Sequence, residues 1–407
     1  MNKYSLDGRD IVIVGQQSWD TNIGSNCKDI ALEFSKHNRI LYVNPPLDRI
    51  TLLRRKSDPY VKKQLEVIDN VRSGIRQINE NLWELDIDVI IESIRWLRIR
   101  WLFNLLNKRN NYIFSRSISS AIGQLGFKNI ILFNDNDIFR SFYLKEYLKP
   151  SLSIYYSRDY MLGVDYWKFH GKVLEPELIR KSDLIIANST YLTNYCKQYN
   201  ENARYVGQGC DLRMFLKKPV DNVTGEELGV IAGIRGPKIG YVGSLNSDRL
   251  DINIILHIAR NRPDWSIILV GPADDKFEAS ELKQLPNVYF TGLVAETRLP
   301  LYLNFFDVCI NPQLVNEITI GNYPRKIDEY LAVGKPVVAT ATEAMEIFRE
   351  YVYLADSPSD YVRLIDNSLK DNTVAMELGR QEFAKEHSWE NSVNLVYKSI
   401  LETEKGF

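Results

Sequence analysis

A repeated alternation of short apolar segments with helical segments is the feature that most constrains the fold of this 407-residue chain. The apolar segments are β-branched or aromatic and end in polar residues or glycine. In the first half they are DIVIVG, RILYVNPP, NIILFND, LSIYYSRD, DLIIANS and ARYVGQG. Runs of this kind are typical of buried parallel strands, and their alternation with helices predicts a doubly wound α/β sheet over residues 1–215.

A stretch rich in glycine and proline, KKPVDNVTGEELGVIAGIRGPK, interrupts this pattern and predicts a linker over residues 216–236. The alternation then restarts with IGYVGSL, WSIILVGP, NVYFTG, VCINP and KPVVAT. We therefore expect a second parallel α/β domain over residues 237–385. Residues 386–407 form one more amphipathic helix in this prediction. Two domains also suit a chain too long for one ordinary core.

Composition excludes several functional classes. The net charge of −1 gives no overall attraction to nucleic acid, and no recognition motif for it is present. The chain has no run of about 18 apolar residues that could span a membrane, and its start does not resemble a signal peptide. Its cysteines, Cys27, Cys196, Cys210 and Cys309, lack the spacing of a metal site or a disulfide framework. We therefore expect a cytoplasmic protein.

Ligands of open α/β sheets bind at the carboxyl ends of the strands, so the loops there are the first candidates for a site. Strands of the second half end at Gly243, Gly271, Gly292 and Pro312. Glycine lets a backbone approach a ligand closely, although a tight turn explains each glycine equally well. The glycine fingerprints of dinucleotide-binding domains and P-loops are absent.

The segment NYPRKIDEYLAVGKPVVAT, residues 322–340, carries more specific information. Pro324 suits the first turn of a helix and Gly334 suits its end. Lys326 and Glu329 are three residues apart and share a face. A lysine at a helix start is unfavourable by itself, and an anionic diphosphate would remove the conflict. Glu329 could then accept hydrogen bonds from a ribose. The alternative is a surface Lys–Glu pair.

Three segments together, residues 240–272, 287–312 and 323–340, resemble the C-terminal donor domain of family 4 glycosyltransferases of GT-B fold. Residues 183–215 resemble the end of that family's N-terminal domain. The pattern is most similar to members that act in bacterial cell-surface polysaccharide assembly. The resemblance implies two Rossmann-like domains that face each other across a cleft, with the last helix packing back on the first domain.

The family transfers a sugar from a nucleotide-diphosphate sugar to a hydroxyl of a glycan or lipid-linked acceptor, usually with retention and without a metal or other cofactor. The four histidines, at 37, 170, 257 and 387, are far apart in the sequence and form no evident metal cluster. Neither the base (UDP, GDP or dTDP) nor the sugar, acceptor or linkage follows from the sequence.

The resemblance assigns roles to individual donor-side residues. Glu329 matches the second glutamate of the family's pair, which holds the ribose. Arg249 and Lys326 fall where basic residues contact the diphosphate. The remaining expected donor-binding residues are Gly243 and Ser244, in the loop under the diphosphate, and Gly292, in the turn beside the base.

The chain also departs from the family pattern. Gly321 stands where the first glutamate of the pair, which contacts the donor sugar, is expected. Glu317 or Asn322 could replace it. Ser244 stands where the family has an arginine, and Arg325 could help to supply that charge.

In the first domain, Gly24 resembles the family's glycine beside the acceptor and the diphosphate, although a helix-capping turn at Ser25 or Asn26 is compatible with the same residues. Arg158 and Asp159 end a strand on the acceptor side. Asp159 is the candidate catalytic residue, which would steer the acceptor hydroxyl or accept its proton. The alternatives are a structural Arg158–Asp159 ion pair and proton transfer to the leaving diphosphate itself.

Residues 93–116 interleave arginine and lysine with tryptophan and leucine, without an acidic residue. Such a pattern is typical of a helix in a membrane interface, so we expect docking on an anionic membrane surface. An ordinary helix with a basic outer face is the alternative.

Two other functions remain open from the sequence. A sugar-nucleotide epimerase of GT-B type would need acid and base groups in the cleft, usually histidines. A non-catalytic nucleotide-sugar-binding protein would be consistent with the missing first glutamate.

Overall fold

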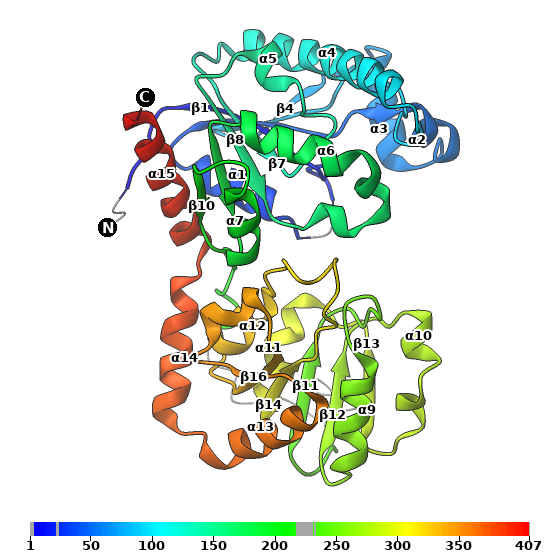
Figure 1. The fold of residues 1–407 in the computed structure, drawn as a ribbon, viewed down its shortest axis with the longest axis vertical. Helices are drawn as coiled ribbons and strands as arrows, with labels where there is room; N and C mark the ends of the chain where they lie inside the picture. The colour runs from blue at the N-terminus through cyan, green and yellow to red at the C-terminus, as the bar shows by residue number, and fades with distance from the viewer. Residues whose placement is uncertain (1–3, 22–23, 217–230, 232, 407) are drawn as a thin grey trace. The chain divides into compact units, whose positions relative to one another are not determined.

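The computed structural model describes residues 4–21, 24–216, 231 and 233–406 (Figure 1). It contains two compact units, one formed by Met1–Gly207 with Trp389–Phe407 and one by Gln208–Ser388. The first unit thus ends before the predicted boundary at residue 215. Residues 217–230 and 232 of the predicted linker lie outside the described residues.

The first unit is built on an eight-stranded sheet with the order β10-β9-β8-β7-β1-β2-β5-β4. Neighbouring strands are parallel except for β4 and β5. The strands are β1 (Asp10–Val14), β2 (Arg39–Val43), β4 (Ile75–Asn79), β5 (Leu82–Leu85), β7 (Ile131–Asp135), β8 (Leu152–Ser157), β9 (Leu184–Ala187) and β10 (Ala203–Tyr205). A small parallel sheet pairs β3 (Leu47–Asp48) with β6 (Ile90–Ile91).

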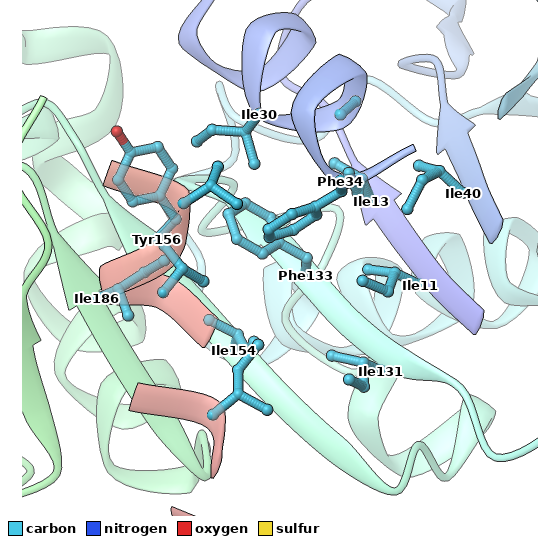
Figure 2. Close-up of a cluster of buried hydrophobic side chains, with 14 of the residues drawn as sticks. Ile11, Ile13, Ile30, Phe34, Ile40, Ile131, Phe133, Ile154, Tyr156 and Ile186 are labelled. Atoms are coloured by element: carbon cyan, nitrogen blue, oxygen red, sulfur yellow. The ribbon is translucent and has the colours of Figure 1, made fainter. Parts of the chain in front are cut away.

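The helices of the first unit cover both faces of this sheet. They are α1 (Asn26–Phe34), α2 (Arg49–Arg54), α3 (Pro59–Ile68), α4 (Arg100–Leu125), α5 (Leu144–Leu148), α6 (Asp165–Lys181), α7 (Thr190–Lys197) and α15 (Trp389–Lys405). Figure 2 shows the core between α1, α15 and the central strands, where isoleucines surround Phe34, Phe133 and Tyr156. The α15 helix belongs to this core, because the Tyr397 ring stacks on Phe34 at 5.4 Å between centroids.

The second unit has a six-stranded, entirely parallel sheet with the order β13-β12-β11-β14-β15-β16. Its strands are β11 (Lys238–Val242), β12 (Ser266–Val270), β13 (Val288–Gly292), β14 (Val308–Asn311), β15 (Val337–Thr340) and β16 (Tyr353–Ala355). Its α-helices are α9 (Ile252–Asn261), α10 (Asp275–Glu278), α11 (Leu299–Phe305), α12 (Lys326–Ala332), α13 (Pro358–Asp371) and α14 (Val374–Glu386). The prediction of two doubly wound parallel-sheet domains is therefore confirmed.

The strand orders identify where each unit can hold a ligand. The order reverses between β1 and β7 in the first unit and between β11 and β14 in the second. Open α/β sheets bind ligands outside the carboxyl ends of the strands at such a reversal. The loops that follow β1, β7, β11 and β14 are therefore the structural candidates for a site.

The chain passes between the units twice, after Gly207 and after Ser388. These two passages are held together on the side of the second unit. The backbone N–H of Cys210 donates a hydrogen bond to the carbonyl of His387 at 2.9 Å, and Cys210 and Ser388 form a parallel β-bridge.

Candidate functional site

The carboxyl ends of β11, β12 and β13 meet through their backbones. Gly243 and Gly271 both have φ of +140°, and the N–H of Gly243 donates to the carbonyl of Val270 at 2.9 Å. A Cβ atom on Gly271 would lie 2.1 Å from the Gly243 carbonyl oxygen, so only glycine fits there. The N–H of Gly271 donates in turn to Gly292 at 3.0 Å. Backbone hydrogen bonds thus connect the strand ends that carry the predicted residues Gly243 and Gly292. Ser244, which follows Gly243, is exposed.

Lys326 lies against this turn. Its Nζ donates a hydrogen bond to the Tyr241 hydroxyl and lies 4.1 Å from the centroid of that ring. A Cβ atom on Gly243 would be 3.0 Å from the same Nζ. The Tyr241 hydroxyl donates onward to the carbonyl of Ser244 at 3.2 Å. Among the described residues no carboxylate lies within 4 Å of the lysine, so its charge remains available to an anion.

Glu329 is also on α12, one turn after Lys326, and its side chain is 15% exposed. The Arg325 Nε lies 3.7 Å from Glu329 Oε1, which is an ion pair without a direct hydrogen bond. Burial raises the pKa of Glu329 to about 7, although Arg325 and Lys326 oppose this shift. The alternative considered for these residues, a surface pair of Lys326 with Glu329, is therefore not the arrangement observed, and the Glu329 oxygens accept no hydrogen bond from the described residues.

Buried polar side chains hold α12 in place. The Tyr330 hydroxyl accepts a hydrogen bond from the N–H of Val242 at 2.9 Å and donates to the carbonyl of the same residue at 3.2 Å. On the other side of the helix, His387 Nδ1 lies 2.6 Å from Asp328 Oδ1, and the Tyr323 hydroxyl donates to Asp328 Oδ2 at 2.9 Å. Burial raises the pKa of Asp328, and His387 opposes that shift.

Sequence reasoning did not select these supporting residues. The helical spacing of Ile327, Asp328 and Tyr330 could have marked them as the inward face of α12. Nothing local could have indicated His387, which is 59 residues away along the chain from its partner Asp328, or Tyr241, which is 85 residues from Lys326.

The residues near the missing glutamate differ in their surroundings. Gly321 is buried and Glu317 is exposed. The side-chain oxygen of Asn322 is buried and accepts no hydrogen bond among the described residues, and the Asn311 Nδ2 at the end of β14 is buried without an acceptor. Buried polar atoms normally have hydrogen-bond partners. These two amide groups are therefore candidates to form hydrogen bonds with a bound ligand.

Arg249 stands in the loop after β11. Its backbone carbonyl accepts from the N–H of Leu314 at 2.8 Å, and Asp251 N–H donates to Pro312 at 2.9 Å, so this loop is tied to the loop after β14. The Arg249 side chain is exposed and has no partner among the described residues. No described contact brings it to Lys326.

In the first unit, Arg158 and Asp159 follow β8. Arg158 Nε lies 2.7 Å from Asp135 Oδ1, and its Nη1 lies 2.8 Å from Asp159 Oδ2. Burial disfavours the charge of Arg158, but Asp135 and Asp159 outweigh it and raise the pKa of the guanidinium. The ion pair considered for Arg158 and Asp159 is thus present. The Asp159 side chain is still 40% exposed.

Gly24 is exposed and immediately precedes Ser25, the N-cap residue of α1. The predicted capping is not made by the side chain, because Ser25 Oγ forms no capping hydrogen bond and is buried without a partner among the described residues. Residues 22 and 23, which precede Gly24, lie outside the described residues.

The basic segment 93–116 has both buried and exposed apolar side chains. It includes the first part of α4, which packs into the core through Phe103 and Phe114. Large apolar side chains of the same segment are exposed, namely Trp96, Ile99, Trp101 and Leu105. Within the described chain, no helix is both long enough and apolar enough to cross a membrane. The described residues also contain no group of three or more histidine, cysteine or acidic side chains that could hold a metal ion.

Comparison with known proteins finds similarity to glycosyltransferases. Residues 236–371 match the family described as glycosyl transferases group 1. A Bacillus subtilis (strain 168) protein, provisionally named as the teichuronic acid biosynthesis glycosyltransferase TuaH, is 27% identical over 248 residues. That match covers 58% of this chain and 60% of the relative.

Solved structures show the same fold over nearly the whole chain. Sucrose-phosphate synthase from Thermosynechococcus elongatus matches with a TM-score of 0.68 and 14% identity, covering 98% of this chain and 99% of that one. Anabaena HepE in complex with UDP matches with a TM-score of 0.65 and 17% identity, covering 98% and 100%. These likenesses show the GT-B fold, and with the family match of residues 236–371 in the second unit they agree with the predicted resemblance to family 4 glycosyltransferases.

Proposed function

We propose that this protein transfers a sugar from a nucleotide-diphosphate sugar to a hydroxyl of a glycan or lipid-linked acceptor in polysaccharide biosynthesis. The observation that carries the proposal is Lys326, held by Tyr241 against the Gly243 turn with no acidic partner among the described residues, with Glu329 one turn away. The provisional name of the Bacillus subtilis relative and the UDP and UDP-glucose complexes of HepE support it.

The donor would bind along the carboxyl ends of the second sheet. The Gly243–Ser244 backbone and the Lys326 ammonium would hold the diphosphate, since a charged donor makes the stronger hydrogen bonds to phosphate oxygens. Arg249 would add a second cation, as its side chain is exposed in the same loop, which follows β11. Glu329 would accept the two ribose hydroxyls, and the Gly292 turn would lie beside the base.

The sugar would be recognised without the usual glutamate. In its place, the unsatisfied side-chain oxygen of Asn322 would accept a hydrogen bond from a sugar hydroxyl. A neutral amide both donates and accepts, which a carboxylate cannot do. The preferred sugar would then differ from that of relatives that keep both glutamates.

Transfer itself would be retaining and independent of a metal ion. The bond from the anomeric carbon to the diphosphate breaks, the acceptor oxygen bonds to that carbon on the same face, and the acceptor proton passes to a diphosphate oxygen. Lys326 and Arg249 would stabilise the charge on the departing nucleotide. Asp159, fixed by Arg158, would orient the acceptor hydroxyl, so that catalysis rests on positioning and electrostatics.

The proposal includes a location on the cytoplasmic face of an anionic membrane. Exposed Trp96, Trp101 and Leu105 beside Arg98 and Arg100 support it, because aromatic and basic side chains together favour the interface. Binding to phosphatidylglycerol vesicles, with no binding to phosphatidylcholine vesicles, is the expected result of a flotation assay. Absence of binding to phosphatidylglycerol vesicles, or equal binding to both kinds of vesicle, would remove this part of the proposal.

A donor panel tests the function. Thermal shift with UDP-, GDP- and dTDP-sugars should identify one nucleotide family that stabilises the protein, and nucleotide release from that donor should require an acceptor. Binding without acceptor-dependent release would favour a non-catalytic nucleotide-sugar-binding protein, and epimerised donor without an acceptor would favour an epimerase.

The Glu329→Ala variant tests the site, with Glu350→Ala as a control that removes an exposed glutamate of the same unit. Unchanged donor affinity in Glu329→Ala would show that the site has been placed wrongly.

A further inference from the structure

The first unit contains a cavity of about 360 Å³ that the donor site does not use. It lies between α2, the segment 93–98 and the first turns of α6. The α2 helix follows β2 and β3, and α6 follows β8, so the cavity is on the carboxyl-end side of the first sheet. Ligands of open α/β sheets bind on this side, and in the proposed reaction this unit receives the acceptor.

Arg95 is the central feature of the cavity wall. Its guanidinium stacks 3.8 Å above the Tyr166 ring and lies 5.3 Å from the centroid of Trp167. Among the described residues it has neither a hydrogen-bond acceptor nor an acidic partner within ion-pair distance. Burial, with the nearby charge of Arg140, lowers the pKa of Arg95 to about 10. A half-buried, unpaired cation is unfavourable unless a ligand supplies the counter-charge.

The carboxylates that line the cavity do not supply that charge. Asp48 caps α2, where it accepts hydrogen bonds from the N–H groups of Ile50 and Thr51 and from the Ser93 hydroxyl. Asp165 is exposed to solvent. The attraction of Asp48 for Arg95 therefore acts only at a distance, and the cavity retains a positive character.

Other cations and aromatic side chains complete the wall. Arg54 and Arg98 also line the cavity, and neither has an acidic partner among the described residues. Arg98 lies 4.4 Å from the centroid of Phe169. Three of the aromatic residues that line the cavity are at least half exposed: Trp96 at 67%, Tyr166 at 53% and Phe169 at 50%. Large exposed aromatic surfaces next to unpaired arginines suit a ligand with an anionic end and an apolar chain.

We propose that this Arg95 cavity binds the phosphate of a lipid-linked acceptor, that is, a phosphate or diphosphate carried on an apolar chain. The guanidinium groups of Arg95, Arg98 and Arg54 hold the phosphate, whose oxygens match their forked donors. The exposed rings of Trp96, Tyr166 and Phe169 hold the first part of the chain. The assignment deepens the proposed function, since it selects the lipid-linked acceptor over a free glycan.

Binding of a short prenyl phosphate to the full chain tests this inference without any donor. Farnesyl phosphate should bind at least tenfold more tightly than farnesol or inorganic phosphate, as followed by quenching of tryptophan fluorescence. Arg95→Gln should weaken farnesyl phosphate binding at least tenfold. Arg180→Gln, which removes an exposed arginine of α6 outside the cavity, should bind like the parent. Equal binding by Arg95→Gln, or equal binding of farnesol, would overturn the inference.

Further arms separate the possible sources of phosphate and guard against misfolding. If Arg95→Gln loses binding to phosphatidylglycerol vesicles and farnesyl phosphate does not compete with them, the ligand is a phospholipid head group and the inference is wrong. Tyr166→Ala removes an exposed ring and should also weaken farnesyl phosphate binding, which keeps the test decisive if Arg95→Gln does not fold. Nucleotide binding by Arg95→Gln should remain normal. The experiments can therefore disprove the assignment of the cavity without disproving that of the donor site, and the reverse.

Discussion

At the scale of single residues, Glu329 changes its charge near neutral pH, because burial on α12 raises its pKa to about 7. Only the carboxylate can accept hydrogen bonds from both ribose hydroxyls. We therefore expect donor affinity to fall as the pH drops through 7. Glu329→Gln should bind the nucleotide roughly 10- to 100-fold more weakly at pH 8, the loss expected for a hydrogen bond to a charged group.

Calorimetric titration of the nucleotide between pH 6 and pH 8 checks this expectation. The profile of Glu329→Gln should be flat, and Glu350→Gln should follow the parent. Parallel profiles for the parent and Glu329→Gln would show that another group controls the pH dependence.

Glu175 links pH to the stability of the first unit. Its buried carboxyl accepts hydrogen bonds from Tyr155 at 2.8 Å and Tyr195 at 3.1 Å, and burial raises its pKa from 4.5 to about 7. Between these values the folded protein holds a proton that the unfolded chain has released. As the pH rises from 4.5 to about 7, this group should therefore lower the free energy of unfolding by about 1.4 kcal/mol for each pH unit.

Urea denaturation of Glu175→Gln and the parent at pH 5 and pH 8 measures the effect. The stability of the glutamine variant relative to the parent should improve by roughly 2–3 kcal/mol at the higher pH. A difference that does not change with pH would mean that Glu175 ionises normally in the folded protein.

At the scale of elements, α12 shows what a sequence can and cannot predict. Pro324 and Gly334 marked a helix between them, and the observed helix runs from Lys326 to Ala332 with Arg325 as its N-cap. The shared face of Lys326 and Glu329 followed from helical spacing. The sequence did not predict that Glu329 pairs with Arg325 and not with Lys326, because this choice depends on the directions of the side chains.

The same limit applies to the sheets. Parallel strands could be located from short apolar runs that end in glycine, since burial on both faces leaves that signature. Contacts between loops could not, because backbone approaches such as Gly271 to Gly243 depend on strand order. The Arg95 cavity could not be predicted from the sequence either. Arg95 is only one of several basic residues in segment 93–116, and its aromatic neighbours come from α6.

The link between α12 and α14 gives a prediction at this scale. His387→Ala would leave the buried Asp328 carboxyl with the Tyr323 hydroxyl as its remaining partner. We expect the free energy of unfolding of the second unit to fall by roughly 1–3 kcal/mol, the cost of leaving a buried polar group short of a partner. Donor affinity should also fall, because Lys326 and Glu329 share the helix.

A double-mutant cycle with Asp328→Asn separates this link from a general loss of packing. A coupling energy above roughly 0.5 kcal/mol is expected for residues in one hydrogen-bond network. His257→Ala, on α9, is the matched control and should leave donor affinity unchanged. Additive effects of the two substitutions would argue against the link.

At the scale of the whole molecule, the division into two compact units, each with hydrophobic clusters of its own, implies that stability is not a single quantity. Tyr397→Ala in α15 removes the ring stacked on Phe34 and the hydroxyl that accepts from Asn38 Nδ2 at 3.1 Å. We expect it to destabilise the first unit by about 3–5 kcal/mol, as for other large aromatic truncations in a core.

Nucleotide binding, which the proposal assigns to the second unit, should survive the same substitution. Denaturation followed with and without nucleotide resolves the two transitions, because a bound ligand stabilises only the unit that holds it. Loss of nucleotide binding in Tyr397→Ala would show that the first unit supports the donor site directly.

The assignment of α15 to the first core has a consequence for biosynthesis. The second unit is one continuous stretch, Gln208–Ser388, whereas the first needs residues from both sides of it. At about 5–20 residues per second, the ribosome takes on the order of 10–40 s to make that stretch. During this time the apolar side chains around Phe34 that pack against α15 are left uncovered by it. The second unit can therefore mature first, and the nascent first unit is the part that would recruit a chaperone.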